Sequence, residues 1–89
     1  MGYELDFSDQ ANKGIAFHKK AGDKAVLKKL NNLLEELIEH PRTGTGQVEV
    51  LKHYSEETLS RRINREHRLV YRIREETVQV LILSAHGHY

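Results

Sequence analysis

A chain of 89 residues with a hydrophobic fraction of 38% and a charged fraction of 30% has room for one domain, which we expect to span residues 1–89. The absence of cysteine excludes disulfides and Cys-ligated metal sites, and the longest apolar run, VLIL, is far too short for a membrane span. The N-terminal residues have no signal-peptide character, so we expect a cytoplasmic protein.

The first expected elements are a strand and a helix. Apolar residues alternate with acids over residues 3–7, which is the period of a strand. Ser8 is a good N-cap for a helix over residues 9–21, and Gly22 fits the stop at its C-terminus. Gly14 weakens this helix, because glycine is a poor helix former.

A second, more strongly amphipathic helix is expected over residues 24–40. Asp23 can cap its N-terminus, and Pro41 ends it. Its apolar residues recur at the spacing of one helical face: Val26, Leu27, Leu30, Leu33, Leu34, Leu37 and Ile38. The two helices, separated by a Gly-Asp turn, therefore predict an αα-hairpin.

After a flexible loop with the sequence PRTGTGQ, the period of the pattern changes to two. The expected strands are residues 48–53, the hairpin partners 59–64 and 67–74, and the very apolar 77–85, which should be central. We write the expected order as β-α-α-β-β-β. This is an α+β domain with both helices on one face of a largely antiparallel sheet.

All of the arginine lies in the second half of the chain. Residues 41–89 hold seven Arg and one Lys against six acids, a net charge of +2, whereas residues 1–40 hold six Lys against seven acids, a net charge of −1. The guanidinium group is shaped for bidentate contacts with phosphate. A run of charge is also typical of a solvated face, so this segregation alone leaves both interpretations open.

Alternation along the strands sorts the arginines by face. If Leu69 faces the helices, Arg68 projects from the other face of the sheet, and Arg62 does the same on the neighbouring strand. Arg61 falls on the side opposite to Arg62. Glu49 belongs to a strand whose orientation the pattern does not decide.

Glutamate, arginine, lysine and histidine without cysteine or a paired-carboxylate motif point to phosphodiester chemistry without a metal. Cleavage of RNA of this kind needs a base for the 2′-hydroxyl, an acid for the 5′-oxygen, and cations around the phosphorane. The competing interpretation is that the carboxylate is a surface group, the arginines pair with acids and the histidines are solvated.

The segment LKHYSEETLSRRINREHRLVYRI and the terminal pair HY closely resemble the YoeB/Txe family of bacterial toxins, within the RelE-like superfamily of ribosome-dependent mRNA interferases. The family pattern has a Gly-rich loop, a Glu three residues before a Lys-His pair, then SRRI, EHRLVY and a closing HY. All of these are present in order. The resemblance covers residues 41–89 and implies a RelE-like fold, whereas the helices match only in length and pattern.

The resemblance assigns catalytic roles residue by residue. Glu49 matches the general base, Arg68 the arginine that stabilises the transition state, and His88 the general acid. Tyr89 matches the terminal aromatic residue that helps to orient the substrate. The implied reaction is attack by the 2′-hydroxyl, which yields a 2′,3′-cyclic phosphate and a free 5′-hydroxyl, with no metal and no cofactor.

The resemblance also implies binding residues and partners. Lys52 and Arg62 match positions that hold backbone phosphate, and Arg61 is a weaker third candidate. The implied partners are mRNA, the ribosome whose A site presents the codon, an antitoxin that masks the site, and a second copy in a homodimer. Two rival interpretations stay open: a non-catalytic ribosome- or nucleic-acid-binding module, and a protein-interaction module.

Some residues depart from the family pattern or have no assigned role. Gly87 stands where a bulkier residue is common, and His86 is an additional histidine that we interpret as a spectator or a phosphate contact. We expect His53 and His67 to be structural or hydrogen-bonding residues, and Tyr71 to lie in the core. The His-x-His pair near the end lacks an obvious third ligand for a metal.

Overall fold

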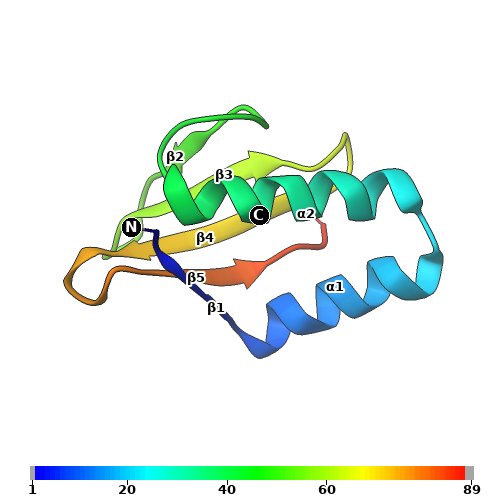
Figure 1. The fold of residues 1–89 in the computed structure, drawn as a ribbon, viewed down its shortest axis with the longest axis horizontal. Coiled ribbons are helices and arrows are strands. Elements are labelled where there is room, and N and C mark those ends of the chain that lie inside the picture. The colour runs from blue at the N-terminus through cyan, green and yellow to red at the C-terminus, as the bar shows by residue number, and fades with distance from the viewer. Residues whose placement is uncertain (1, 88–89) are drawn as a thin grey trace.

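The computed structural model describes residues 2–87, so the predictions for His88 and Tyr89 lie outside the described residues (Figure 1). Its elements in chain order are β1 (Glu4–Phe7), α1 (Asp9–Ala21), α2 (Lys24–Glu39), β2 (Glu49–Leu51), β3 (Thr58–Arg62), β4 (Arg68–Arg74), the short 3-10 helix η1 (Glu75–Thr77) and β5 (Gln79–Ser84). Four strands follow the helices in this part of the chain, one more than the order β-α-α-β-β-β allows. Three of the four lie within a segment whose pattern predicted a strand, and β3 begins one residue before its predicted segment 59–64.

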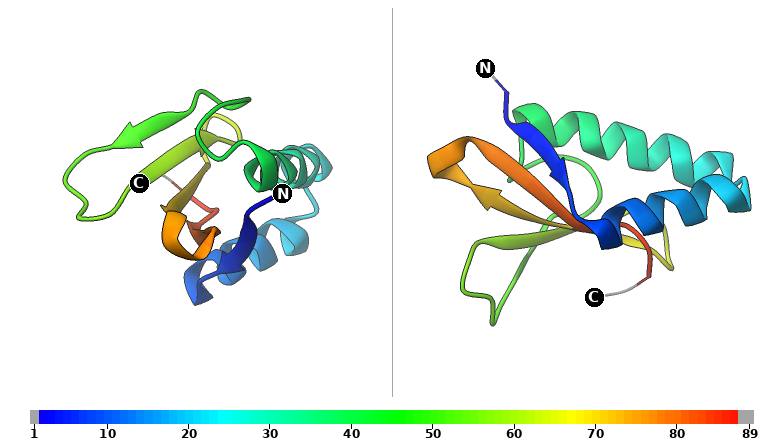
Figure 2. Two further views of the ribbon diagram at one scale, coloured as in Figure 1. Left: turned by 60° about the vertical axis from the view of Figure 1, so that its left-hand side comes forward. Right: turned by 90° about the horizontal axis from the view of Figure 1, so that it is seen from below.

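The five strands form one sheet in the order β1-β5-β4-β3-β2. Neighbours pair antiparallel except β1 and β5, which are parallel. Both helices cover the same face (Figures 1 and 2). The predicted α+β class, with a largely antiparallel sheet and helices on one face, is confirmed, and β5 lies inside the sheet as its apolar sequence indicated.

The helix ends follow the predicted caps. Ser8 Oγ accepts a hydrogen bond from the Ala11 amide at 3.0 Å, and Asp23 Oδ1 accepts one from the Val26 amide at 3.2 Å. Gly22 ends α1 with φ 71°, a conformation that glycine adopts at little cost. α2 ends at Glu39, one residue before the predicted end.

The core lies between the helices and the sheet. From the sheet it takes Leu59, Leu69, Tyr71, Ile73, Val80 and Ile82, and from α2 the buried stripe Val26, Leu30, Leu33 and Leu37. Tyr71 is fully buried, as predicted. Because side chains alternate along a strand, the residues between these core positions point away from the helices, onto what we call the open face. No helix in residues 2–87 combines the length and the apolar character that a membrane crossing requires.

Candidate active site

The register of the sheet decides which of the predicted site residues share a face. Glu49 pairs with Ser60 and Ser60 with Val70, so all three belong to the open face. Arg62 follows Ser60 by two positions and lies directly opposite Arg68. Opposite side chains have Cβ atoms about 4.5–5.5 Å apart, and diagonal neighbours are separated by about 7–8 Å. The sheet therefore gathers Glu49, Arg62 and Arg68 on the open face, and it settles the orientation of β2.

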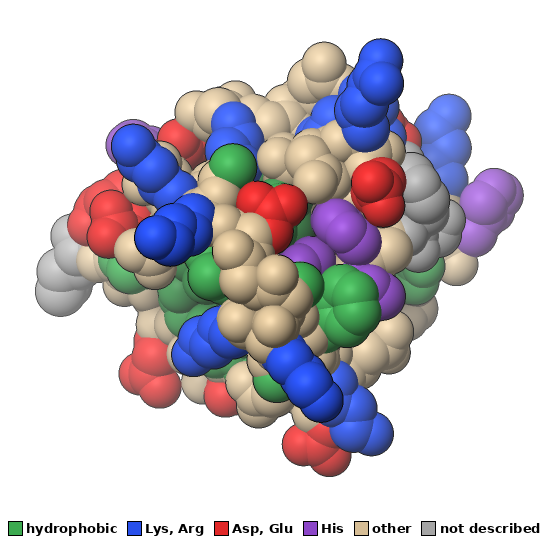
Figure 3. Space-filling model, turned by 90° about the vertical axis from the view of Figure 1, so that its right-hand side faces the viewer, with side chains coloured by type: hydrophobic (Ala, Val, Ile, Leu, Met, Phe, Trp, Pro, Cys, Tyr) green, Lys and Arg blue, Asp and Glu red, His purple; other side chains and the backbone are tan. Residues whose placement is uncertain are grey.

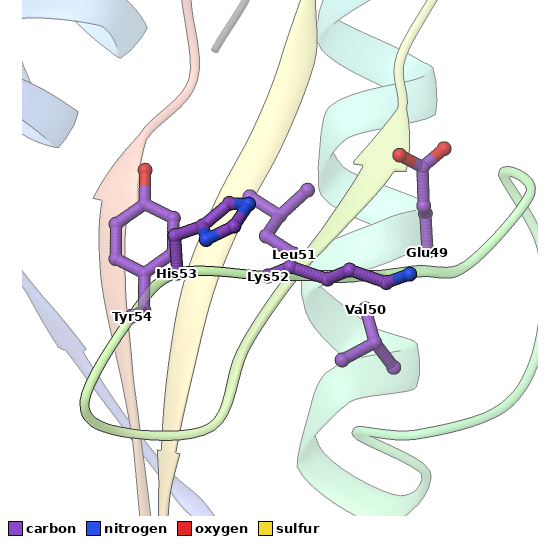
Figure 4. A pocket seen from close by; sticks show the side chains of 6 residues that line it. All are labelled: Glu49, Val50, Leu51, Lys52, His53 and Tyr54. Carbon is purple, nitrogen blue, oxygen red and sulfur yellow. The ribbon is translucent and has the colours of Figure 1, made fainter.

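The strand that carries Glu49 is an edge strand of only three residues, and a pocket along it is lined by residues 49–54 (Figure 4). Glu49 and Leu51 project to one side of the strand and Val50 to the other. Beyond the strand, His53 turns the chain with φ 71°. Lys52, directly after the strand, lines the same pocket as Glu49.

Arg62 is the exposed cation of this group. Within residues 2–87 it has no carboxylate partner, whereas Arg72 and Arg74, further along the open face of β4, approach Glu56 at 3.1 and 3.9 Å. The interpretation that Arg62 pairs with an acid therefore fails within residues 2–87, although Arg72 and Arg74 do lie beside one.

Arg61 does not belong to the site, and its predicted role in substrate binding is wrong. It lies on the helix side of β3, with its side chain fully buried. Its guanidinium donates to five acceptors: Tyr71 Oη at 3.0 Å, Glu36 Oε1 at 2.9 Å, and the carbonyls of His40, Thr43 and Thr45 at 2.6, 2.8 and 3.4 Å. A guanidinium has five N–H donors, so none is left for phosphate.

Arg61 instead fixes the Gly-rich loop. Thr45 donates to Glu36 through both its amide and its hydroxyl, at 2.8 and 2.6 Å. These bonds, together with Arg61, hold the pKa of Glu36 below its usual value. Gly44 has φ 126°, and a Cβ there would lie 2.3 Å from Glu36 Oε1. The glycine is therefore required by close packing against α2, and the loop delivers the chain into β2 and to Glu49.

Four aromatic rings gather where the segment that follows β5 meets α1, and one of them belongs to that segment. The rings are Phe17, His18, His67 and His86, and we call them the ring cluster; Figure 3 shows the face of the molecule on which histidines gather beside a hydrophobic side chain. The Gly87 amide donates to His67 Nδ1 at 2.9 Å, which confirms a hydrogen-bonding role for His67. His86 is exposed and stacks on His67 with ring centroids 4.9 Å apart, a contact that the sequence did not predict.

The sequence interpretation missed Phe17 and His18, which lie on α1, far from the motifs in the chain. His18 is 1% exposed. A histidine among the lysines at a helix C-terminus is ordinarily interpreted as a solvated residue, because its charge favours that end of the helix. The signal that could have found it is spacing, because Ala11, Gly14, Ile15 and His18 recur at the interval of one helical face.

One face of the sheet carries the carboxylate of Glu49 and the guanidinium groups of Arg62 and Arg68. The last described residue, Gly87, lies beside them. The Arg68 amide donates to the Gly87 carbonyl at 3.0 Å, so residue 87 lies against the start of β4. Within residues 2–87 no three His or acidic side chains are arranged to hold a metal ion. A carboxylate beside paired guanidinium groups is suited to proton abstraction next to a stabilised phosphate.

Comparison of the sequence with protein families matches residues 7–89 to the YoeB-like toxin of bacterial type II toxin–antitoxin systems. Toxin YoeB of Escherichia coli strain K12 is 40% identical over 67 residues, which are 75% of this chain and 77% of that protein. Toxin YoeB of Synechocystis is 43% identical over 67 residues, covering 75% and 76% of the two chains.

Solved structures agree with this match over nearly the whole chain. A YoeB/ParE toxin from Agrobacterium tumefaciens superposes with a TM-score of 0.88 at 28% identity, covering 97% of this chain and 99% of that one. A YoeB dimer from Staphylococcus aureus gives 0.83 at 35% identity, and the YoeB–YefM complex from the same organism gives 0.81 at 34% identity, each covering 98% of both chains.

Proposed function

Because this chain belongs to the YoeB-like toxins of bacterial type II toxin–antitoxin systems, we propose that it is an endoribonuclease that cleaves mRNA in the ribosomal A site without a metal. The observation that carries this proposal is the sheet register, which gathers Glu49, Arg62 and Arg68 on one face. A structural carboxylate and two unrelated surface arginines would not need to meet there.

In the proposed mechanism Glu49 takes the proton from the 2′-hydroxyl of the nucleotide before the scissile bond. The freed oxygen attacks the adjacent phosphorus, and negative charge builds on the non-bridging oxygens. Arg68, with Arg62 directly across from it, stabilises that charge through hydrogen bonds with cationic donors, which are stronger than neutral ones. Two guanidinium groups facing each other suit a dianionic phosphorane between them.

The second half of the reaction needs an acid for the departing 5′-oxygen, and we assign it to His88. Imidazole is suited to this task because its unperturbed pKa lies near working pH. Tyr89 would orient the substrate by stacking on a base. Both residues lie outside the described part of the chain. Their assignment is supported by Gly87, the residue just before them, whose carbonyl accepts a hydrogen bond from the amide of Arg68.

Substrate binding is assigned to Lys52 and Arg62. Arg62 is exposed and has no carboxylate partner within residues 2–87, and Lys52 lines the same pocket as Glu49. Both cations flank the carboxylate, so a strand of RNA crossing the open face would place its backbone phosphates over them. Binding through phosphate carries no sequence information, which fits a nuclease whose codon is presented by the ribosome.

The proposed protein partners are a cognate antitoxin and, in a homodimer, a second copy of the chain, with the cytoplasm as the place of action. The Staphylococcus aureus proteins that this chain resembles form a dimer and a complex with YefM. On this chain, the edge strand β2 presents exposed Val50 and, just beyond it, exposed Tyr54. An unpaired strand edge with apolar side chains is a surface that partner proteins commonly cover.

The test is single-turnover cleavage of mRNA on programmed ribosomes. Glu49→Gln and Arg68→Ala are each expected to lower the cleavage rate by roughly 10² or more while ribosome binding stays near parental, because a general base and a charge-stabilising group contribute about that much. The matched controls are Glu76→Gln and Arg74→Ala, which make the same changes at exposed positions far along the sheet. Parental rates for both site variants would refute the assignment and favour a binding module.

A further inference from the structure

The segment that follows β5 is held by side chains from two distant elements. His18 of α1 reaches the carbonyl of Ala85 through Nε2 at 2.7 Å, and the Gly87 amide donates to His67 Nδ1 at 2.9 Å. Between these two bonds, His86 packs its ring against Phe17 at 4.1 Å and stacks on His67 at 4.9 Å. Residues 85, 86 and 87 are thus each fixed by at least one imidazole.

α1 is shaped to receive this segment. Gly14 lies where a Cβ would come within 3.1 Å of His86 Cβ and 3.2 Å of its amide nitrogen, so the absence of a side chain admits the segment. His18, one turn further along the same helix face, is fully enclosed and edge-on to His67 at 4.6 Å. Gly14 weakens α1 as a helix, but a residue without a side chain is needed there because the segment packs directly against it.

The two hydrogen bonds define the protonation states of the two rings. A carbonyl can only accept, so His18 Nε2 carries a hydrogen. An amide N–H can only donate, so His67 Nδ1 is unprotonated and offers its lone pair to Gly87. A proton added at His67 Nδ1 would set two N–H groups against each other. The His18 bond survives protonation of its ring, whereas the His67 bond does not.

We propose that His67 is a positioning residue and a pH-sensitive latch: with Nδ1 unprotonated it holds the Gly87 amide beside the start of β4, and protonation at Nδ1 breaks this bond and loosens the hold on Gly87. The consequence for cleavage rests on the proposed function, because His88 is the residue joined to Gly87. Gly87 is held twice, by His67 and by the Arg68 amide, so the latch fixes the segment to the strand that carries Arg68.

Imidazole and charged side chains surround His67 within residues 2–87. The titratable groups that face it there are His18 from α1 and His86 from the segment itself, both with ring centroids within 5 Å. Arg68 and Glu66 adjoin it in the chain, and Lys13 of α1 lines a pocket with His86. An unperturbed imidazole takes up its proton near pH 6.5, so a range from pH 7.5 to 5.0 covers the proposed change.

The experiment uses pairs of variants that separate the hydrogen bond from the titration. Asparagine places a carbonyl oxygen close to the position of Nδ1 and has no charge to gain, so His67→Asn is expected to keep the bond and the cleavage rate at pH 7.5. His67→Ala removes the acceptor and is expected to lower the single-turnover rate about tenfold or more at saturating toxin, with the half-saturating concentration nearly unchanged. His40→Asn, at an exposed position at the end of α2, is the matched control.

The second readout does not depend on activity. In the parent protein and in His40→Asn, the amide resonance of Gly87 is expected to shift between pH 7.5 and 5.0 together with the ring resonances of His67, and in His67→Asn it is expected to stay in place. A Gly87 amide that does not respond to pH in the parent, or parental cleavage by a folded His67→Ala variant, would overturn the latch. Failure of the parent to cleave mRNA would instead refute the proposed function, and the Gly87 resonance would still decide the latch.

Discussion

Two adjacent arginines on β3 offer the sharpest test of the architecture, because they carry the same charge and face opposite sides of the sheet. Arg61 is fully buried and bonded to five acceptors, whereas Arg62 is exposed on the open face. We expect Arg61→Met to destabilise the fold strongly and Arg62→Met to leave stability unchanged while weakening RNA binding. Methionine keeps an unbranched apolar chain, so both substitutions remove a guanidinium without opening a large cavity.

The magnitude for Arg61 follows from its partners. Removing one member of a buried ion pair costs about 3–5 kcal/mol when the other charge is left buried. The side chain of Glu36 is 32% exposed, so solvent relieves part of that cost. However, Tyr71 Oη and three carbonyls also lose a donor, at about 1 kcal/mol for each that stays buried. We therefore expect a loss of at least about 3 kcal/mol, a large part of the roughly 4–13 kcal/mol typical of a domain of this length.

Urea unfolding followed by circular dichroism measures this loss. With a slope of about 1–3 kcal/mol per molar urea, the midpoint of Arg61→Met should fall by roughly 1–3 M, whereas Arg62→Met should stay within about 0.5 kcal/mol of the parent. Arg61→Lys should resemble Arg61→Met, because one ammonium cannot span acceptors arranged around a planar fork. Equal midpoints for Arg61→Met and the parent would refute the view that Arg61 holds the Gly-rich loop to α2.

Three further predictions concern the salt dependence of RNA binding, the removal of the last two residues, and the loss of stability at acid pH. Ribosome or RNA binding should weaken steeply as salt is raised, and Arg62→Met should reduce the slope of log affinity against log salt by about 1; a parent whose affinity is flat with salt would contradict the electrostatic open face. Removal of His88 and Tyr89 should abolish cleavage in the ribosome assay while the melting temperature stays unchanged, since residues up to 87 keep their core contacts. The lowered pKa of Glu36 means that its stabilising contribution is complete above its ordinary value of 4.5 and is lost as the pH falls through the lower folded value. Glu36→Gln should therefore show a weaker fall in stability below pH 4.5 in urea titrations.

The local parts of the fold could be predicted from the sequence. Ser8, Gly22 and Asp23 act through contacts within three or four residues, so their capping roles are visible in the sequence itself. The buried stripe of α2 and the alternation of β4 are equally local. The parallel pairing of β1 with β5 was not specified, because it joins segments at opposite ends of the chain and leaves no trace in either one.

The candidate site was predicted unevenly for a related reason. The alternation of β4 placed Arg68 on its face and that of β3 separated Arg61 from Arg62, yet resemblance to the family still kept Arg61 as a weak phosphate ligand. Arg61 cannot take that role because it is buried, and the acceptors that hold it come from α2 and from the loop that follows α2. Glu49 could not be oriented from its own three-residue strand, and only the register with β3 puts it on the open face.

The ring cluster shows where reading a chain segment by segment fails altogether. Gly14 taken alone weakens a helix, and His18 taken alone resembles a solvated residue at a helix end. Their meaning depends on His86, which stacks on His67 and packs over the glycine. A helix can tolerate the roughly 1 kcal/mol cost of an internal glycine when the space it leaves is filled by another part of the chain. The apparent weakness in α1 is thus the place at which the first helix meets the last described residues, and this contact links the helical layer to the face that carries Arg68.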